Sequence, residues 1–394
     1  MPLETPEIPV FEGDLFSEEA LKTPFPIYKE IRDMGPVVYF PKHDFYAIGR
    51  YADVKLALRS AETLISGKGV GLNPVINAPQ GESAQIIATD GEKHKRMRKP
   101  IFEAIGPQPV QQYRDRLKEM VSNHIETLKG AGWVEGVTSI AHYLPVSVVS
   151  HLVGVPEEGR QNLLRWASAG FDLVGPDLDA LGPQIEVLME AIDFMATVEP
   201  SSLKRGSWSD ALFQCVERGE LSELEARAAL AAYILPSLDT TIYAKSNLLF
   251  NLGQNPDQWQ KLKSNPSLVL SAVLEGVRHS AIVRLFTRFA ESDYSQGDVS
   301  LPKGARVALL YGSANRDGRH YEDPDAFLVD RNPRDQLGWG HGIHMCGGMH
   351  LAKLEMEVLL EAMVEQVEMI EVDAPEISTN FGLYGIESMQ VRLT

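Results

Sequence analysis

The 394 residues exceed the usual size of a small domain, so the chain folds either as two domains or as one domain around something large. Its composition, 44% hydrophobic and 23% charged, is that of a globular protein, and its net charge of −17 argues against nucleic-acid or anionic-membrane partners held by general electrostatics. Two cysteines do not form a disulfide framework, the N-terminus lacks a signal-peptide pattern, and no stretch of about 18 apolar residues predicts a membrane span. We therefore expect a cytoplasmic protein.

Near the N-terminus the sequence predicts β structure followed by a loop. The apolar segments 37–40 and 45–50 flank residues 41–44 and predict a β-hairpin. Residues 68–92 are rich in Gly, Pro and Asn, so we expect a long surface loop there. Long ordered loops are often functional.

After this loop helical periodicity dominates the sequence. Strand-like material returns only at 306–312 and near the C-terminus, so the fold class is mainly α with a minor β part. No repeat or flexible linker divides the chain, which predicts a single domain over residues 1–394. The predicted helices cover residues 93–104, 109–129, 158–172, 180–198, 222–253, 267–279 and 347–367.

The segment around Cys346 carries the most chemical information. Gly340, Gly342, Gly347 and Gly348 surround this cysteine, and a periodic helix follows it. Glycines let the backbone approach a flat ligand closely and adopt positive φ angles. Because Cys346 stands just before a helix N-terminus, we expect the helix dipole and free N–H groups to lower the pKa of its thiol from about 8.5 and to favour a thiolate.

Two other interpretations of this segment remain open. His341, His344, Cys346 and His350 could bind zinc, but their spacing matches none of the usual paired zinc-ligand patterns. A buried free cysteine without chemistry is also common, and we assign that role to Cys215, which lies in an amphipathic stretch.

Residues 339–348, WGHGIHMCGG, resemble the haem-binding signature Phe/Trp-Gly-x-Gly-x-His-x-Cys-x-Gly of cytochromes P-450. On these residues the chain is identified as a member of that family. The resemblance implies the cytochrome P-450 fold, one haem b, and Cys346 as the axial ligand of the haem iron, with Trp339, Gly340 and His344 also against the haem. In this family the cysteine thiolate pushes electron density toward the iron and favours O–O cleavage.

The resemblance also implies a site for the two haem propionates. His94 and Arg98 stand four residues apart in a predicted helix and so share one face. In the family this His-x-x-x-Arg pattern binds propionates, and Arg288 and His344 look like their partners. Two carboxylates removed from water need charge-assisted hydrogen bonds. The alternative for His94 is a solvated surface residue.

A charged pair upstream of Cys346 matches a structural element of the family. Glu275 and Arg278 form its Glu-x-x-Arg motif and, three residues apart, lie on one helix face. The resemblance implies that both join Arg331 in a buried network behind the haem. The alternative is a surface helix pair that contributes little to stability.

Residues 235–241, LPSLDTT, stand where the family has Ala-Gly-x-Asp/Glu-Thr-Thr in a long helix above the iron. By resemblance, Asp239 and Thr240 are the acid–alcohol pair that relays protons during oxygen activation. Pro236 and Ser237 replace the usual Ala-Gly. A mid-helix proline removes a backbone hydrogen bond, so we expect a kink. The alternative is a threonine that only bonds back within its helix.

Several short segments are similar to soluble bacterial family members that act on para-substituted aromatics. Residues 71–89 should close over the substrate but contain no Lys or Arg, and only Arg284 and Ser237 could compensate a buried carboxylate. We therefore expect a small neutral or phenolic arene, such as a methoxyarene that is O-demethylated, rather than a benzoate. The substrate residues implied by family position are Phe171, Val174, Leu238, Val283 and Phe286.

No nicotinamide or flavin fingerprint is present, so electrons from NAD(P)H must arrive through separate proteins, by resemblance ferredoxin reductase and ferredoxin. The basic residues of the helix that carries His94 predict either a docking surface for an acidic ferredoxin or an ordinary solvated face; they are Lys93, Lys95, Arg96 and Lys99. Two rivals to an O2-dependent monooxygenase remain: a peroxide-driven peroxygenase, which Pro236-Ser237 keeps open, and a non-catalytic haem sensor or carrier, against which Asp239-Thr240 argues.

Overall fold

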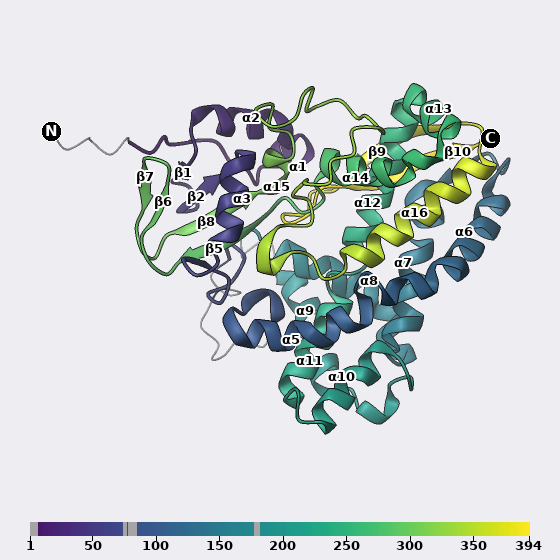
Figure 1. Cartoon of the computed structure of the whole chain (residues 1–394), viewed down its shortest axis with the longest axis horizontal. Helices are drawn as coiled ribbons and strands as arrows, with labels where there is room; N and C mark the ends of the chain where they lie inside the picture. Colours follow the sequence, from purple (N-terminus) through teal and green to yellow (C-terminus); the bar gives the residue numbers. More distant parts are fainter. Residues whose placement is uncertain (1–6, 74–76, 78–84, 177–181) are drawn as a thin grey trace.

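The computed structural model describes residues 7–73, 77, 85–176 and 182–394 (Figure 1). Its five-stranded sheet lies on one side of the molecule together with α2 (Pro24–Met34) and α3 (Tyr51–Arg59), and helices make up most of the rest. None of the helices in these ranges combines the length and the apolar character that crossing a bilayer requires. The mainly α architecture with a minor β part, predicted from the sequence, is confirmed.

The five-stranded sheet has the order β1-β2-β8-β5-β3. The predicted hairpin is present as antiparallel β1 (Val38–Phe40) and β2 (Phe45–Ile48), with Phe40 opposite Phe45. The strand β5 (Leu285–Ala290), which lies between β8 and β3, was not predicted, because the polar residues Thr287 and Arg288 interrupt its apolar pattern although both are buried. The remaining strands are β3 (Leu64–Ile65) and β8 (Arg306–Leu310) in this sheet, β4 (Trp133–Glu135), β9 (Ile370–Ile377) and β10 (Ile386–Leu393) in a second, and β6 (Tyr294–Gln296) and β7 (Val299–Leu301) in a third.

Most predicted helices occur within a few residues of their expected bounds. The helices that carry or support the site are α5 (Gly91–Ile105), α6 (Arg114–Leu128), α8 (Glu157–Asp172), α9 (Gly182–Thr197), α14 (Val269–Ser280) and α16 (Met349–Gln366). The sequence did not predict several others, which are α1 (Glu18–Lys22), α7 (Tyr143–Val148), α10 (Trp208–Glu217), α13 (Pro256–Ser264) and α15 (Tyr311–Ala314), besides α2 and α3.

The expected continuous helix over 222–253 is wrong. The chain forms α11 (Glu223–Ile234), which begins with the predicted Ser222–Glu225 capping box, and a separate α12 (Asp239–Gln254). Proline lacks the N–H that an interior helical position must donate, and its ring clashes with the preceding turn. At Pro236 this effect breaks the helix instead of only bending it.

The prediction of a surface loop over 68–92 holds only in part for the residues that the structure describes, since Lys68, Gln85 and Ile87 are exposed but others are not. Val70, Asn73, Ile86 and Thr89 are all buried. Residues 74–76 and 78–84 of this segment, and therefore much of the expected substrate-covering loop, lie outside the described residues. The backbone at Val70 lies next to β5, since the Thr287 N–H donates to the Val70 carbonyl.

A buried ion pair joins α12 to α16, the helix that follows Cys346. The Lys245 ammonium lies 2.6 Å from the Glu355 carboxylate, and the two side chains are only 1% and 3% exposed. A charge at this depth is tolerated only when paired. The pair therefore sets how α12 and the start of α16 lie relative to each other, on either side of the candidate site.

Candidate active site

The loop before α16 is shaped by two glycines with positive φ. Gly340 and Gly342 have φ angles of 71° and 74°. A Cβ at Gly342 would also lie 2.6 Å from the carbonyl oxygen of Leu58. Both the positive φ and this short distance therefore exclude a side chain at Gly342. The Cys346 N–H donates to the Trp339 carbonyl at 2.8 Å and closes the loop. This backbone presents Cys346 just ahead of the N-terminus of α16.

Gly347 and Gly348 are not explained by the packing of the protein. Neither has a positive φ, and a Cβ added at either would meet its nearest neighbour only at 3.7 and 4.0 Å, which is ordinary contact. A Cβ at Gly340 would also have room, because its nearest neighbouring atom would be 3.8 Å away. Bare backbone beside a thiol suits the close approach of a flat group, so this donor loop fits a haem.

The expected lowering of the Cys346 pKa is wrong for the protein by itself. Burial raises the pKa of the thiol and outweighs three opposing effects, the N–H of Gly348, the charge of Arg98 and the N–H of Met349. Cys346 keeps accessible surface, but surrounding protein atoms desolvate the sulfur. Two N–H dipoles and one guanidinium do not offset that cost. A metal ion that binds the sulfur would deprotonate the thiol.

The four expected propionate-binding residues converge from three separate segments. His94 and Arg98 lie on α5, Arg288 lies on β5, and His344 precedes Cys346. The rings of His94 and His344 are 4.3 Å apart between centroids, and Arg98 donates to the carbonyl of Met345. Arg288 is close enough to His344 for its charge to lower the pKa of that imidazole.

This basic set has unused hydrogen-bonding capacity. The Nε2 atom of His94 is buried without a hydrogen-bond partner, and His94 is only 2% exposed. Burial, together with the charges of His344 and Arg98, lowers the pKa of His94 to about 4. Arg288 uses one nitrogen on the Thr287 carbonyl at 2.8 Å. The two guanidinium groups of Arg98 and Arg288, together with an orphaned buried nitrogen, fit a group that carries two carboxylates.

The zinc interpretation fails on geometry. Among the described residues no three His, Cys, Asp or Glu side chains converge as metal ligands. His341 instead accepts from Arg59 at 2.9 Å, and His350 packs edge-on against Phe102.

Cys215 is buried, and burial raises the pKa of its thiol.

The break between α11 and α12 redirects the acid–alcohol pair. Thr240 donates its hydroxyl to the Pro236 carbonyl at 2.7 Å, and Asp239 bonds to Ser168 of α8. The two side chains are therefore not partners of each other. The sequence did not predict Ser168 or its neighbour Asp172, because nothing local links α8 to α12.

Asp239 lies in a buried acidic environment. Burial raises its pKa to about 7, the Ser168 hydrogen bond lowers it, and the charges of Asp172 and Glu387 raise it further. Burial likewise raises the pKa of Asp172 to about 6, against a hydrogen bond from the Phe381 N–H. Asp239 can thus hold and release a proton close to neutral pH.

The residues expected to bind substrate are apolar but differ in exposure. Leu238 is fully buried, while Phe171 and Val174 are 8% and 5% exposed and belong to two different core clusters. Val283 and Phe286 are half-buried, and Phe286 packs against all three core clusters of the protein. Phe286 is therefore the residue that lies where the helical core and the sheet meet.

Arg284 points away from this region. Its guanidinium donates to four backbone carbonyls, those of Leu21, Leu383, Asn380 and Ser378, at 2.6 to 3.3 Å. Ser237, the other polar candidate, donates its hydroxyl to the Ile234 carbonyl at 3.1 Å.

The Glu275 network is centred on a fully buried carboxylate, while Arg331 at its edge is 11% exposed. Glu275 and Arg278 are 0% exposed, and Glu275 accepts from Arg278 at 2.7 and 2.8 Å and from Arg331 at 3.2 Å. The Leu328 N–H donates to the same carboxylate at 2.9 Å. This excludes the alternative of an exposed helix pair.

The basic residues of α5 are largely paired. Lys95 contacts Glu92 at 2.6 Å, Arg96 contacts Glu225, and Lys99 lies 3.8 Å from Glu103. These contacts leave less net positive charge on this face than the sequence suggested.

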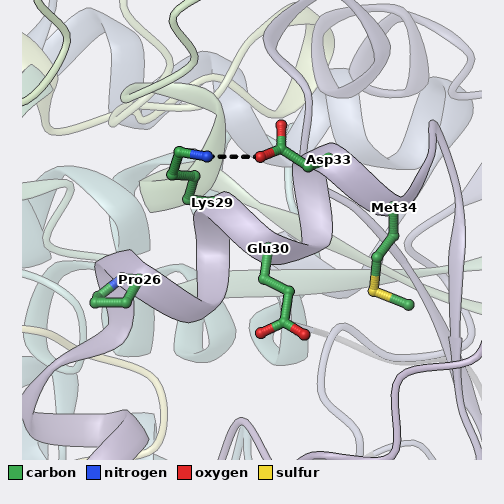
Figure 2. Close-up of a pocket in the computed structure, with 5 residues that line it drawn as sticks. All are labelled: Pro26, Lys29, Glu30, Asp33 and Met34. Atoms are coloured by element: carbon green, nitrogen blue, oxygen red, sulfur yellow. Dashed lines mark hydrogen bonds and ion pairs between the residues drawn. The ribbon is translucent and has the colours of Figure 1, made fainter.

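A shallow depression on the surface is lined by residues of α2 alone, and the Lys29–Asp33 ion pair crosses it at 2.7 Å (Figure 2). Its five lining residues include no predicted site residue. They are Pro26, Lys29, Glu30, Asp33 and Met34.

Comparison with known proteins shows the family to which the chain is similar. The cytochrome P-450 family model matches residues 184–388. The chain is 30% identical to cytochrome P-450 CYP199A2 of Rhodopseudomonas palustris, over 100% of this chain and 98% of the relative. It is 29% identical to the beta-dihydromenaquinone-9 omega-hydroxylase of Mycobacterium tuberculosis, over 97% of this chain and 78% of the relative. Its fold matches the crystal structure of CYP109E1 from Bacillus megaterium with a TM-score of 0.86, at 22% identity, over 95% of this chain and 99% of that one.

Proposed function

The chain belongs to the cytochrome P-450 family and is a haem-containing monooxygenase, and we propose that it oxidises a small neutral or phenolic arene with electrons from NAD(P)H. The observation that supports the haem site best is the loop around Cys346, where unconstrained glycines and two N–H groups face a single thiol. When bound, the haem supplies oxygen activation, with the thiolate favouring O–O cleavage.

In this proposal the protein holds the haem through two groups of residues. Cys346 would provide the sulfur ligand of the haem iron, and Trp339, half-buried against the largest core cluster, would shield that sulfur. The propionates would be bound by the basic set, in which the orphaned His94 nitrogen would gain a partner. The set comprises His94, Arg98, Arg288 and His344.

Proton delivery falls to Asp239 and Thr240. A carboxyl group with a pKa about 7 is suited to give and regain protons at neutral pH, and Ser168 orients it. The Thr240 hydroxyl can pass on a proton only after it turns from the Pro236 carbonyl, which it contacts in the structure. The Pro236 carbonyl, at the break between α11 and α12, therefore belongs to the site.

The electrostatics near the substrate residues favour an uncharged substrate. Asp172 directly follows Phe171, and with a pKa of about 6 it is largely ionised above neutral pH. Arg284 and Ser237 are committed to backbone carbonyls. Among the described residues, a benzoate buried here would lie near the Asp172 and Asp239 carboxylates while the Arg284 cation is turned to backbone carbonyls, which is costly.

Matched methoxyarenes test this proposal. We expect 4-methoxybenzamide and methyl 4-methoxybenzoate to bind and to shift the haem from low to high spin, whereas 4-methoxybenzoate binds at least about tenfold more weakly because its charge is unpaired. Absorption titration of the purified enzyme measures all three. Tight binding of 4-methoxybenzoate, with no spin-state shift from its two neutral analogues, would contradict the proposal. It would mean that a cation other than Arg284 pairs with the substrate carboxylate.

A reconstituted electron-transfer system tests the partner and the relay together. With NADH, a ferredoxin reductase and a ferredoxin, we expect product and NADH consumption to match in the wild type, and Thr240→Ala to divert most electrons to hydrogen peroxide. Val283→Ala serves as a control, because it alters substrate packing but not proton delivery. Turnover supported by peroxide alone, with coupling unchanged in Thr240→Ala, would favour a peroxygenase.

The same system tests whether an acidic ferredoxin docks on the basic residues of α5. A rate of reduction by ferredoxin that does not change with salt concentration would contradict docking guided by charge.

A further inference from the structure

Asp90, which the sequence did not single out, connects three distant segments of the chain. It stands immediately before α5, in an extended conformation with φ −129° and ψ 174°. Its carboxylate accepts from the Gly67 N–H at 2.6 Å and from the Ser66 N–H at 3.2 Å. It also contacts the Nε2 atom of His344 at 3.3 Å.

The contact with the 66–67 backbone requires a glycine. A Cβ at Gly67 would lie 2.8 Å from the Asp90 carboxylate, although Gly67 has no positive φ angle. The chain after Gly67 is tied down in turn, since Arg306 donates to the carbonyls of Lys68 and Gly69 at 2.9 and 2.8 Å. The carboxylate of Asp90 is therefore received by a backbone that is held in place from β8.

Two of the three propionate-binding segments meet at this carboxylate. Asp90 precedes His94 by one turn of α5, and it contacts His344 of the cysteine loop, whose ring lies against that of His94. A carboxylate accepts hydrogen bonds only, so the contacted Nε2 atom of His344 carries the proton and the plane of its ring is set. An anion at the N-terminus of α5 is also stabilised by the helix dipole.

The charged form of Asp90 is favoured at this position. Burial raises the pKa of its carboxyl, but the hydrogen bonds from His344, Ser66 and Gly67 outweigh burial and leave the pKa lowered. Charge-assisted hydrogen bonds of this kind are about twice as strong as neutral ones.

We propose that Asp90 is a positioning residue, which holds His344 and the Ser66–Gly67 backbone in the arrangement that binds the haem propionates. This inference rests on the proposed haem site. Asp90 itself does not touch the haem; it acts through His344 and through the start of α5. Groups that orient the direct partners of a cofactor commonly change its affinity by about 10- to 100-fold when they are removed.

Haem transfer from the holoenzyme to apomyoglobin tests the proposal. We expect Asp90→Ala to release haem at least about tenfold faster than the wild type, and Asp90→Asn to fall between them because its amide oxygen still accepts but carries no charge. Glu92→Gln is the matched control, because Glu92 lies in the first turn of the same helix, is exposed and pairs with Lys95 on the surface. Its haem release should equal that of the wild type.

Thermal unfolding of the haem-free full chain separates positioning from general stability. We expect the haem-free Asp90→Ala and wild-type chains to unfold at similar temperatures, while their holoenzymes differ. Wild-type haem release in Asp90→Ala would overturn the proposal, as would a haem-free form destabilised as strongly as the holoenzyme. Arg98→Met separates the positioning role of Asp90 from the propionate site itself. If Arg98→Met releases haem fast but Asp90→Ala does not, only the role of Asp90 is rejected. If both variants release haem as slowly as the wild type, the propionate site is rejected as well.

Discussion

A Cys346→His variant is expected to lose the strongly red-shifted Soret band that the reduced wild-type enzyme shows with CO. An anionic thiolate donates electron density to the haem iron, and a neutral imidazole does so far less. The wild-type thiol is desolvated, and its pKa is raised in the protein alone, so its deprotonation signals that the sulfur is bound to the metal. Difference spectra of the reduced protein with and without CO measure the change.

Cys215→Ala is the control for this substitution. Cys215 is the second cysteine of the chain and lies buried in α10, outside the site. Its removal should leave the red-shifted band unchanged. A colourless wild-type protein that purifies with zinc, or a Cys346→His variant with the wild-type spectrum, would contradict the assignment of Cys346 as the axial ligand.

A Glu275→Gln variant is expected to lose about 3–5 kcal/mol of unfolding free energy or to fail to accumulate as a haem protein. The substitution leaves Arg278, with no exposed surface, and Arg331 without their shared carboxylate. An uncompensated buried charge is costly, whereas the pair itself contributes less than this difference suggests. Urea unfolding of the holoenzyme, followed by the haem absorption and by circular dichroism, measures the loss.

The exposed pair of Lys22 and Glu18 provides the control, since it has the same chemistry without burial. Glu18→Gln should leave the unfolding midpoint unchanged, because exposed ion pairs contribute little. Equal behaviour of the two variants would mean that the Glu275 network does not stabilise the region behind the haem.

Residue spacing alone predicted the local parts of the site, whereas the meeting of His94 and Arg98 with Arg288 and His344 was implied only by the family resemblance. Gly340, Gly342 and Cys346 lie in one loop, and the spacing of three between Glu275 and Arg278 sets one helix face. Local steric rules decide such arrangements, so they can be predicted from the residue types and their spacing. The spacing of His94 and Arg98 follows the same logic.

Other distant contacts, and the depth at which each group is buried, were decided only by the tertiary structure. Asp239 bonds to Ser168 of another helix, Arg284 turns toward four backbone carbonyls, and Asp90 reaches His344 across 254 positions of the chain. Burial also reversed the expected direction of the Cys346 pKa, because desolvation depends on all atoms packed around the sulfur. Residue types and spacings determine local geometry, but solvation and long-range pairing arise only when the whole chain has packed.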